Sequence, residues 1–578
     1  MRAYRAIVGA ATMMVAAPLF GKCEVGRLAE LPVRMSGRQP VVTIGIEGRD
    51  VALLLDSGAF FSTMSQGSAA ELGLKTESLG GARIVGVGGV QTARRVRVDT
   101  ITLAGVPIRN VDFVVAGSET GQTGVLGLNF LAPWDSEYDL GHGAVRFFKS
   151  TGCAGTLMAY WAGDKAVSAV ELLTSPSRHF VVPIEINGVR MRAMLDTGAT
   201  SSMLTRAAAR RLGLTPESKE MVPAGGSSGF GRRRIRTWAA PFQTLRIGGE
   251  EVRRIRLNIG DFDDATFDML IGVDFFLSHR IYVAPAQRRV FFTYEGGPVF
   301  GAGRSAAAGG TAKAIPLEDE PADAEGYAQR GRMRAARGDL TGGLDDLGRA
   351  IAAAPDVAAY RLDRASMLAQ RARFADALAD MDHVVRLRPE DGEALARRAG
   401  LRLAVDGPDR AGALRDADRA ASLLAEASDH RFALARIYST LEAFPAAIAQ
   451  YALWIRFHPD DRRLGSALNG RCWARALTGR ALDLALDDCN AALRFSPNNP
   501  QYLDSRGLVR LRRGDYARAV ADYDAALAKR PRLAWSWYGR GLAKIRLGRA
   551  GEGEADIAAA RAIQPDITQI AERHGVMR

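Results

Sequence analysis

The sequence has few of the residues on which disulfide-rich, metal-dependent and membrane-spanning proteins depend. Only four of its 578 residues are cysteine and seven are histidine. Four cysteines are too few for a disulfide scaffold of this length, and no cysteine or histidine grouping has the spacing of a zinc site. The composition also excludes a polytopic membrane protein. We therefore expect neither a metal ion nor any other cofactor.

What is present is the composition of a soluble, folded chain with several domains. Hydrophobic residues make up 47% and charged residues 24%, which excludes an intrinsically disordered protein. A chain of 578 residues is long enough for roughly three to five domains. The formal net charge of +13 is spread along the chain and does not gather into a stripe that tracks phosphates. We expect no nucleic-acid partner.

Residues 1–22 have the pattern of a targeting segment. Arg2 and Arg5 precede an apolar run at residues 6–20, which is shorter than the roughly 20 residues of a membrane-spanning helix. A short basic start followed by a short apolar run is typical of a secretory signal peptide. Pro18 interrupts the expected cleavage site, so a retained N-terminal anchor is the alternative. We expect a periplasmic or secreted protein, or one anchored by this segment, with no other membrane span.

Two segments of the N-terminal half repeat each other at an offset of 140 residues. PVVTIGIEGRDVALLLDSGAFFSTMSQGSAAELGLKTES begins at Pro40, and FVVPIEINGVRMRAMLDTGATSSMLTRAAARRLGLTPES begins at Phe180. Across 39 ungapped positions, Asp56 aligns with Asp196. Chance does not produce such a match, so the chain carries two copies of one lobe. We place these lobes at residues 38–150 and 178–295.

Each copy predicts β structure that leads into an aspartate. Alternating apolar residues predict two strands, and the second runs directly into Asp56 or Asp196. A short helix then ends at a glycine, and a glycine-rich hairpin follows at residues 85–98 and 222–237. An apolar-apolar-Gly strand follows the hairpin in each lobe.

The paired Asp-Ser/Thr-Gly turns suggest acid–base chemistry. One such turn is usually structural, but a pseudo-twofold axis between duplicated lobes would bring Asp56 and Asp196 together. Two adjoining carboxyls cannot both ionise cheaply, so they share a proton, and one activates water while the other bonds a substrate carbonyl. The neighbouring residues suit hydroxyl bonds across the lobes and close backbone approach: Ser57, Gly58, Thr197 and Gly198.

These residues resemble the retropepsin-like (retroviral-type) aspartic proteases, in particular their bacterial exported relatives. The resemblance covers about residues 38–295 and depends on Asp56-Ser57-Gly58-Ala59, Asp196-Thr197-Gly198-Ala199, the two glycine-rich hairpins and the apolar-apolar-Gly strands. It implies an aspartic-type endopeptidase with Asp56 and Asp196 as its catalytic dyad. It also implies two flaps, which are the hairpins around Gly88, Gly89, Gly225 and Gly226.

Two alternatives to a single-chain protease follow from the same residues. Each lobe could pair with its twin in a second molecule, although the duplication favours pairing within one chain. The lobes could also be a degenerate protease fold that serves as a non-catalytic periplasmic scaffold. Both Asp-Ser/Thr-Gly triplets are intact, which favours the enzyme.

The C-terminal half predicts a second, helical module. Residues 296–322 are rich in Gly, Ala and Pro and predict a linker. Beyond it, prolines recur at intervals of 34 residues, as at 355 and 389 and at 497, 531 and 565. This period resembles tetratricopeptide repeats. We expect about seven repeats over residues 323–578, with a groove for a protein partner. The predicted fold is therefore multidomain: an all-β, acid-protease-like double lobe followed by an all-α solenoid.

The cysteines offer two pairings. Cys472 and Cys489 are 17 residues apart on the two predicted helices of one repeat, where they are expected to face each other. They are either two small buried side chains or, in an oxidising compartment, a disulfide. Cys23 and Cys153 could form another bridge.

Overall fold

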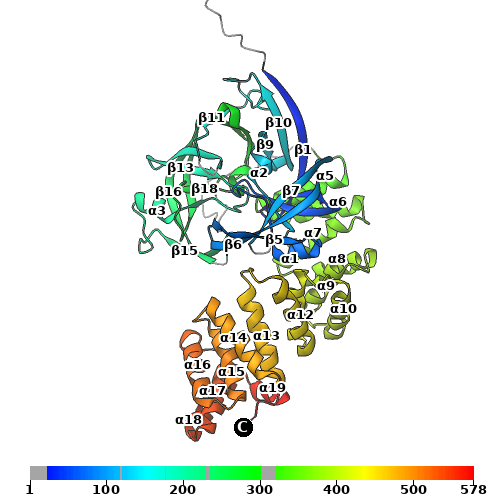
Figure 1. Cartoon of the computed structure of the whole chain (residues 1–578), viewed down its shortest axis with the longest axis vertical. Helices are drawn as coiled ribbons and strands as arrows, with labels where there is room; N and C mark the ends of the chain where they lie inside the picture. Colours follow the sequence, from blue (N-terminus) through cyan, green and yellow to red (C-terminus); the bar gives the residue numbers. More distant parts are fainter. Residues whose placement is uncertain are drawn as a thin grey trace, which may run out of the picture.

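The computed structural model describes residues 23–117, 120–175, 178–229, 231, 234–300 and 320–577. An all-β part is followed by an array of paired helices, which confirms the predicted fold class (Figure 1). The predicted signal peptide or anchor at 1–22 lies outside the described residues. So does most of the predicted linker, at 301–319.

The two lobes have the same strand order. Lobe 1 is the part β2-β3-β8-β4-β7-β6-β5 of a 13-stranded sheet, and lobe 2 is a separate 7-stranded sheet in the order β12-β13-β18-β14-β17-β16-β15, as expected of a duplication. Lobe 1 contains β2 (Gln39–Ile46), β3 (Arg49–Leu55), β4 (Thr63–Met64), α1 (Gln66–Glu71), β5 (Thr76–Gly86), β6 (Gly89–Leu103), β7 (Val106–Val115), β8 (Gly124–Leu126) and α2 (Leu128–Leu131). Lobe 2 contains β12 (Val181–Ile186), β13 (Val189–Leu195), β14 (Met203–Leu204), α3 (Arg206–Arg211), β15 (Val222–Ser228), β16 (Arg234–Ile247), β17 (Glu250–Gly260), β18 (Met269–Ile271) and α4 (Val273–Phe276).

Six strands from both halves join the lobes, in the order β11-β20-β19-β9-β10-β1. They are β1 (Glu24–Ser36), β9 (Asp135–Asp139), β10 (Ala144–Thr151), β11 (Ser168–Glu171), β19 (His279–Ala284) and β20 (Arg289–Tyr294). Gly127 and Gly272 directly follow the equivalent strands β8 and β18, and they are 145 positions apart. In this part of the chain, equivalent residues of the two copies are therefore offset by 145 positions, and no longer by 140. Glu137 pairs with its own equivalent, Tyr282, across β9 and β19. The pseudo-twofold axis therefore passes between these two residues.

Strand β1 lies upstream of the range 38–150 that the sequence predicted for lobe 1. Its first part pairs with β10, from Glu24 opposite Thr151, and its last four residues pair with β2. It therefore connects the joining sheet to lobe 1. The local signal is the alternation of buried Leu31, Val33 and Met35.

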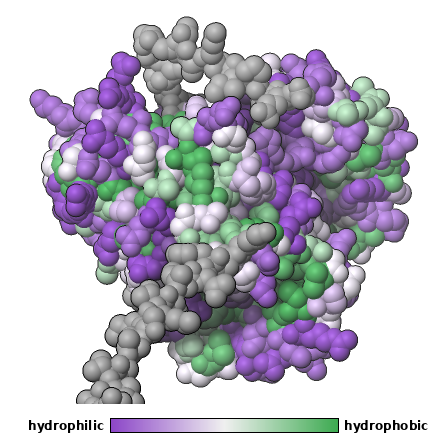
Figure 2. All heavy atoms as spheres, turned by 90° about the horizontal axis from the view of Figure 1, so that it is seen from above, coloured by the Kyte–Doolittle hydropathy of each residue, from purple (hydrophilic) through white to green (hydrophobic). Residues whose placement is uncertain are grey.

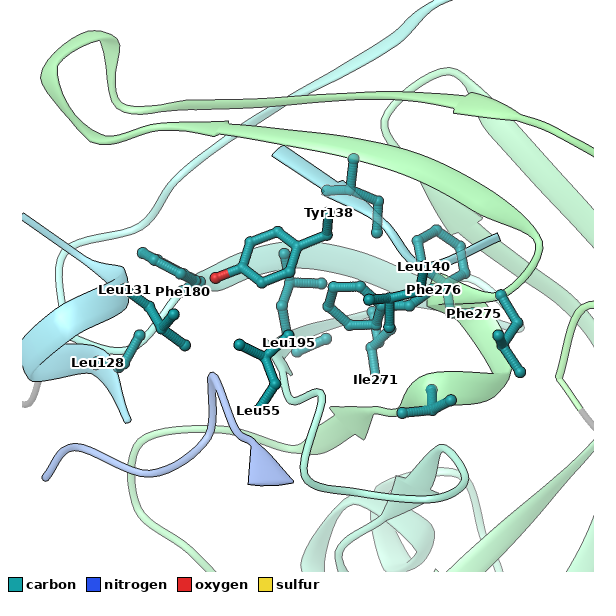
Figure 3. Close-up of a cluster of buried hydrophobic side chains, with 14 of the residues drawn as sticks. Leu55, Leu128, Leu131, Tyr138, Leu140, Phe180, Leu195, Ile271, Phe275 and Phe276 are labelled. Atoms are coloured by element: carbon teal, nitrogen blue, oxygen red, sulfur yellow. The ribbon is translucent and has the colours of Figure 1, made fainter. Parts of the chain in front are cut away.

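A single hydrophobic cluster runs through both lobes beneath the two aspartates. Leu55 and Leu195, which precede the aspartates, lie beside Tyr138 of β9 and Phe276 of α4 (Figure 3). All four side chains are buried. Because this core is shared, neither aspartate-bearing loop can shift without disturbing the other lobe.

Seven helix pairs and a terminal helix form the C-terminal array. They are α5 (Ala324–Ala336), α6 (Leu340–Ala353), α7 (Ala358–Gln370), α8 (Phe374–Leu387), α9 (Gly392–Ala404), α10 (Arg410–Leu423), α11 (His430–Thr440), α12 (Phe444–Phe457), α13 (Leu464–Thr478), α14 (Leu482–Phe495), α15 (Pro500–Arg512), α16 (Tyr516–Lys529), α17 (Ala534–Arg546), α18 (Ala550–Ile563) and α19 (Ile567–Arg573).

An arginine–aspartate pair joins the two helices in six of these seven helix pairs. In α7 and α8, for example, Arg364 holds Asp380 at 2.6 Å. The equivalents are Arg330–Asp346, Arg398–Asp416, Arg471–Asp488, Arg506–Asp522 and Arg540–Asp556. In α11 and α12 an arginine–glutamine contact, Arg431 to Gln450 at 2.5 Å, takes its place. The sequence reasoning missed this ladder, although arginine recurs at 34-residue spacing at positions 330, 364 and 398.

The array is docked on the protease-like part. Met333 and Ala336 of α5 belong to the same hydrophobic cluster as the lobes, and Arg34 of β1 lies 3.2 Å from Asp363 of α7. No helix among the described residues is long and apolar enough to cross a membrane. Hydrophilic side chains cover much of the described surface at the joining-sheet end, with hydrophobic patches between them (Figure 2).

The structure forms both cysteine pairings as disulfides. Cys23 is bonded to Cys153, and Cys472 of α13 is bonded to Cys489 of α14. The first ties the start of β1 to the segment after β10, and the second closes one repeat.

We expect the bridge between Cys472 and Cys489 to stabilise the array measurably. For a loop of 17 residues, replacing both cysteines by alanine should cost about 3 kcal/mol of unfolding free energy. Denaturant unfolding of the wild type and of the double variant, both without reductant so that the bridge between Cys23 and Cys153 stays intact, measures this. Two alkylatable thiols at these positions in the oxidised wild type, found by intact mass, would refute the bridge.

Candidate active site

Each candidate aspartate lies at the end of an inner strand. Asp56 follows β3 and donates its backbone N–H to Leu126 at 3.0 Å, and Asp196 follows β13 and donates its N–H to Ile271 at 2.9 Å. The acceptors belong to the apolar-apolar-Gly strands β8 and β18, which run parallel to β3 and β13. The pattern noted in the sequence therefore fixes the main chain of both turns.

The two carboxyl groups face each other across the pseudo-twofold axis. A Cβ atom added to Gly58 would lie 2.4 Å from Cγ of Asp196, and one added to Gly198 would lie 2.3 Å from Cγ of Asp56. Each glycine therefore leaves the space that the opposite carboxyl occupies, and the carboxyls are joined by a hydrogen bond. The structure thus brings together the two aspartates and the two glycines that the sequence singled out.

Reciprocal hydroxyl bonds lock the two turns together. Oγ1 of Thr197 accepts the N–H of Ser57 at 2.9 Å and donates to the carbonyl of Leu55 at 2.8 Å. In the opposite direction, Oγ of Ser57 accepts the N–H of Thr197 at 3.0 Å and donates to the carbonyl of Leu195 at 2.9 Å. Both hydroxyl residues are fully buried. Four hydrogen bonds between buried groups hold the lobes in one relative position.

Burial raises the pKa of both carboxyls. The pKa of Asp196 is raised well above its usual range, first by burial and then by the negative charge of Asp56. Burial also raises the pKa of Asp56, against the lowering effect of the Gly58 N–H, the hydrogen bond from Asp196 and the Ala59 N–H. The pair therefore titrates as one unit. The two carboxyls share one proton between them.

Outside the dyad, a serine holds each turn. Ser62 and Ser202 occupy equivalent positions of the repeat, and the sequence analysis gave them no role. Ser62 donates its hydroxyl to Asn129 at 2.8 Å and accepts the N–H of Gly127 at 2.9 Å. Ser202 makes the matching bonds to Asp274 at 2.7 Å and from Gly272 at 2.9 Å. The acceptors were missed, although each stands two residues after the glycine of an apolar-apolar-Gly strand.

The two hairpins that the sequence predicts as flaps differ in where their glycines lie. The hairpin of β5 and β6 turns at Gly88, next to Gly89, whereas Gly225 and Gly226 lie within strand β15, opposite residues 237 and 236. In lobe 2 the hairpin reaches the other flap with Gly231, where an added Cβ would lie 2.3 Å from the carbonyl carbon of Gly88. The two flaps therefore touch at their ends. Only Gly88 and Gly89, of the four flap glycines named from the sequence, lie at a hairpin end.

Exposed apolar side chains stand on the lobe 1 turn and on both flaps. Phe60 and Phe61 follow the Asp56 turn and are 37% and 48% exposed, while Val85 and Val90 of flap 1 and Val222 of flap 2 are 76%, 53% and 49% exposed. Exposed apolar groups on the Asp56 turn and on the two hairpins are suited to an apolar ligand. Within the described ranges, no group of three or more His, Cys, Asp or Glu side chains could hold a metal ion.

Comparisons with known proteins place both lobes with aspartyl proteases. Residues 42–133 match a family model described as a gag-polyprotein putative aspartyl protease, and residues 182–275 match an aspartyl protease model. These two matches confirm the resemblance predicted from the sequence. A search of curated proteins found no match.

Two solved structures align with different parts of the chain. A tetratricopeptide repeat protein from Parabacteroides merdae ATCC 43184 is 17% identical, over 44% of this chain and 98% of its own, with a TM-score of 0.34. An aspartic proteinase from Irpex lacteus is 13% identical, over 47% of this chain and 97% of its own, with a TM-score of 0.31.

Proposed function

Because each lobe matches an aspartyl protease model, we propose that this protein is an aspartic endopeptidase whose two catalytic carboxyls come from one chain. The observation that carries the proposal is the pair Asp56 and Asp196, held face to face by the bonds between Ser57 and Thr197. The scaffold alternative requires no such reciprocal arrangement around a shared proton.

The proposed reaction uses the two carboxyls in different protonation states. Asp56, ionised, takes a proton from a water molecule while that water attacks the carbonyl carbon of the peptide bond. Asp196, protonated, hydrogen-bonds the carbonyl oxygen and stabilises the charge that develops there. The tetrahedral intermediate then collapses, its C–N bond breaks, and the proton held by Asp56 passes to the leaving nitrogen. The products are a carboxylic acid and an amine.

We further propose an apolar peptide substrate in an exported setting. The exposed phenylalanines beside Asp56 and the valines on the flaps favour apolar side chains next to the scissile bond. Two disulfides favour a periplasmic or secreted location, or attachment through residues 1–22.

The helical array offers a place for a protein partner. A cavity of about 910 Å³ lies between lobe 1 and the inner helices α7, α9 and α11, which is at the upper end of the range for ligand pockets. Because lobe 1 covers this part of the groove of the helical array, we propose that an extended segment of a partner protein enters the cavity.

The function is tested with the full chain and a peptide library. Products identified by mass spectrometry should show internal cleavage between apolar residues, and pepstatin should suppress it. A folded protein that cleaves no peptide between pH 4 and 8 would favour the non-catalytic scaffold.

The pH profile should reflect the raised pKa values of the dyad. Below the lower apparent pKa of the pair both carboxyls are protonated and the base is lost, and above the higher one the acid is lost, so activity lies between the two. Because alanines follow both triplets, the charge is stabilised by the partner carboxyl and by the backbone N–H groups of residues 58, 59, 198 and 199, with no hydroxyl donor from the residue after either triplet. We therefore expect kcat/KM to fall on the acid side at a pH above the usual range of carboxyl pKa values.

Adding hydroxyl donors beside the dyad should move this acid limb of the pH profile. Ala59→Ser combined with Ala199→Thr supplies side-chain hydrogen bonds to the charged form, which lowers the pKa of the base. The measurement is kcat/KM against pH for both proteins. An acid limb that stays in place in the double variant would contradict this account of the alanines.

A further inference from the structure

A chain of hydrogen bonds runs behind Asp196 and ends on a second carboxyl. The peptide group between Ile271 and Gly272 accepts the N–H of Asp196 at its carbonyl oxygen, at 2.9 Å. The N–H of the same peptide group donates to Oγ of Ser202 at 2.9 Å. The hydroxyl of Ser202 in turn donates to Oδ1 of Asp274 at 2.7 Å. One peptide group and one hydroxyl therefore join Asp274 to the main chain of Asp196.

The equivalent chain in lobe 1 has the same links and ends on a neutral group. The carbonyl of Leu126 accepts the N–H of Asp56 at 3.0 Å, and the N–H of Gly127, in the same peptide group, donates to Oγ of Ser62 at 2.9 Å. Ser62 donates its hydroxyl to Oδ1 of Asn129 at 2.8 Å. The links match bond for bond, and the end group is an amide in lobe 1 and a carboxyl in lobe 2.

The carboxyl of Asp274 is buried and has a cation beside it. Burial raises its pKa, whereas the hydroxyl and N–H of Ser202 and the charge of Arg38 lower it. Arg38 and Arg337 line the same small cavity as Asp274, and Nε of Arg38 donates to the carbonyl of Ala336, the last residue of α5, at 3.1 Å. Since these donors and the guanidinium stabilise the charged form, we expect Asp274 to be ionised at neutral pH.

A histidine and a glutamate also lie near Asp274, on the side of β19. The hydroxyl of Ser278 lies 3.4 Å from the main-chain carbonyl of Asp274 and 3.0 Å from Nδ1 of His279. Nε2 of His279 contacts the carboxyl of Glu250, in β17, at 3.1 Å. Guanidinium groups do not titrate in proteins. His279 and Glu250 are the same in the wild type and in the variants below, so their titration cancels when two pH profiles are compared.

We propose that Asp274 is a positioning residue whose negative charge makes the two halves of the dyad unequal and places the shared proton on Asp196. A charge at one end of a hydrogen-bonded chain polarises the whole chain, and a negative charge on the lobe 2 side disfavours a second one on Asp196. The amide of Asn129 brings no charge to the side of Asp56. The inference rests on the proposed protease function, and it gives a site built from two copies of one lobe a defined base and a defined acid.

The test replaces the end group of one chain by that of the other. Asp274→Asn should fold, because Asn129 accepts the same two bonds from its serine at the matching position. Loss of the charge favours ionisation of Asp196. We therefore expect the basic limb of kcat/KM, where the acid is lost, to move down by about half a pH unit and the acid limb to move less. The reciprocal variant Asn129→Asp tests the claim independently and should move the acid limb up.

Asp268→Asn is the matched control for a buried carboxyl of lobe 2. Asp268 and Asp274 are both 9% exposed. The carboxyl of Asp268 accepts the N–H of Arg192 and pairs with Arg211, and it is part of neither chain. Its replacement should leave both limbs of the profile in place, so a general loss of lobe 2 stability is distinguished from the loss of the charge on Asp274.

A second readout needs no peptide cleavage. Carbon-13 NMR of the full chain, labelled at the aspartate carboxyl carbons, follows the dyad directly, and its two signals are assigned by their loss in Asp56→Asn and Asp196→Asn. In the wild type Asp196 should titrate last, and in Asp274→Asn its midpoint should fall by about half a pH unit. An unmoved Asp196 midpoint, or Asp56 titrating last in the wild type, would overturn this inference and leave the protease function standing. A shifted midpoint in a chain that cleaves no peptide would support the inference and contradict the function.

Discussion

Asp56→Asn and Asp196→Asn should each lower kcat/KM for peptide cleavage by a factor on the order of 10³ or more. The first variant removes the base that takes a proton from water, and the second removes the carboxyl that shares a proton with that base and hydrogen-bonds the substrate carbonyl. Because the carboxyls act as one unit, either loss removes both functions. Initial rates on one cleaved peptide, over the whole pH range, measure the effect.

Asp196→Asn should lower the activity but raise the stability of the fold. Both folded pKa values lie above the unfolded ones, so protonation of the dyad favours the fold at low pH, and this contribution is lost as pH rises through the folded values. Asp196→Asn removes the group that must ionise. We therefore expect its melting temperature to rise relative to wild type between pH 5 and 8.

Asp50→Asn supplies the matched control for both measurements. Asp50 lies in the same strand as Leu55 but is exposed, so its replacement should leave rate and stability nearly unchanged. Substantial cleavage by either dyad variant would contradict a single-chain site. Loss in only one of them would indicate that this lobe pairs with its twin in a second molecule.

Thr197→Val should destabilise the fold by about 3 kcal/mol, because it leaves two buried backbone groups without partners. The N–H of Ser57 and the carbonyl of Leu55 both depend on the hydroxyl that valine lacks. Since these groups lie at the contact of the two lobes, we also expect the dyad to lose its alignment and cleavage to fall at least about 10²-fold. Chemical denaturation and steady-state kinetics measure the two effects.

Thr197→Ser distinguishes the effect of the hydroxyl from the effect of side-chain shape, because serine keeps the hydroxyl and lacks the methyl group. It keeps both hydrogen bonds and should retain most of the stability and activity, whereas Thr43→Val on the exposed face of β2 should cost little. If Thr197→Val proves as stable and as active as Thr197→Ser, the hydroxyl bonds across the lobes do not hold the site.

The features that could be predicted from the sequence are those that appear as regular spacings between residues along the chain. The ungapped repeat shows that Asp56 and Asp196 are equivalent, and equivalence under a pseudo-twofold axis is enough to predict that they meet. The 34-residue interval between prolines is likewise local, and it predicts the helical array. Each of these patterns repeats within the chain, so chance is excluded by the sequence itself.

The features that were missed depend on contacts between distant residues. Strand β1 has a local alternation of apolar residues, but its pairing with β10, with Glu24 opposite Thr151, joins residues far apart in the sequence. The end of flap 2 lies at Gly231 because strands β15 and β16 stay paired beyond Gly225 and Gly226. The contact of Gln91 with Asp460 joins two modules that carry separate sequence signals.

The stoichiometry with which pepstatin titrates the full chain tests the single-chain site most directly. A dyad made of Asp56 and Asp196 from one molecule predicts an end point of one inhibitor per chain, at every protein concentration, and no tight binding to Asp56→Asn or Asp196→Asn. One inhibitor per two chains, with activity per chain falling on dilution, would contradict it.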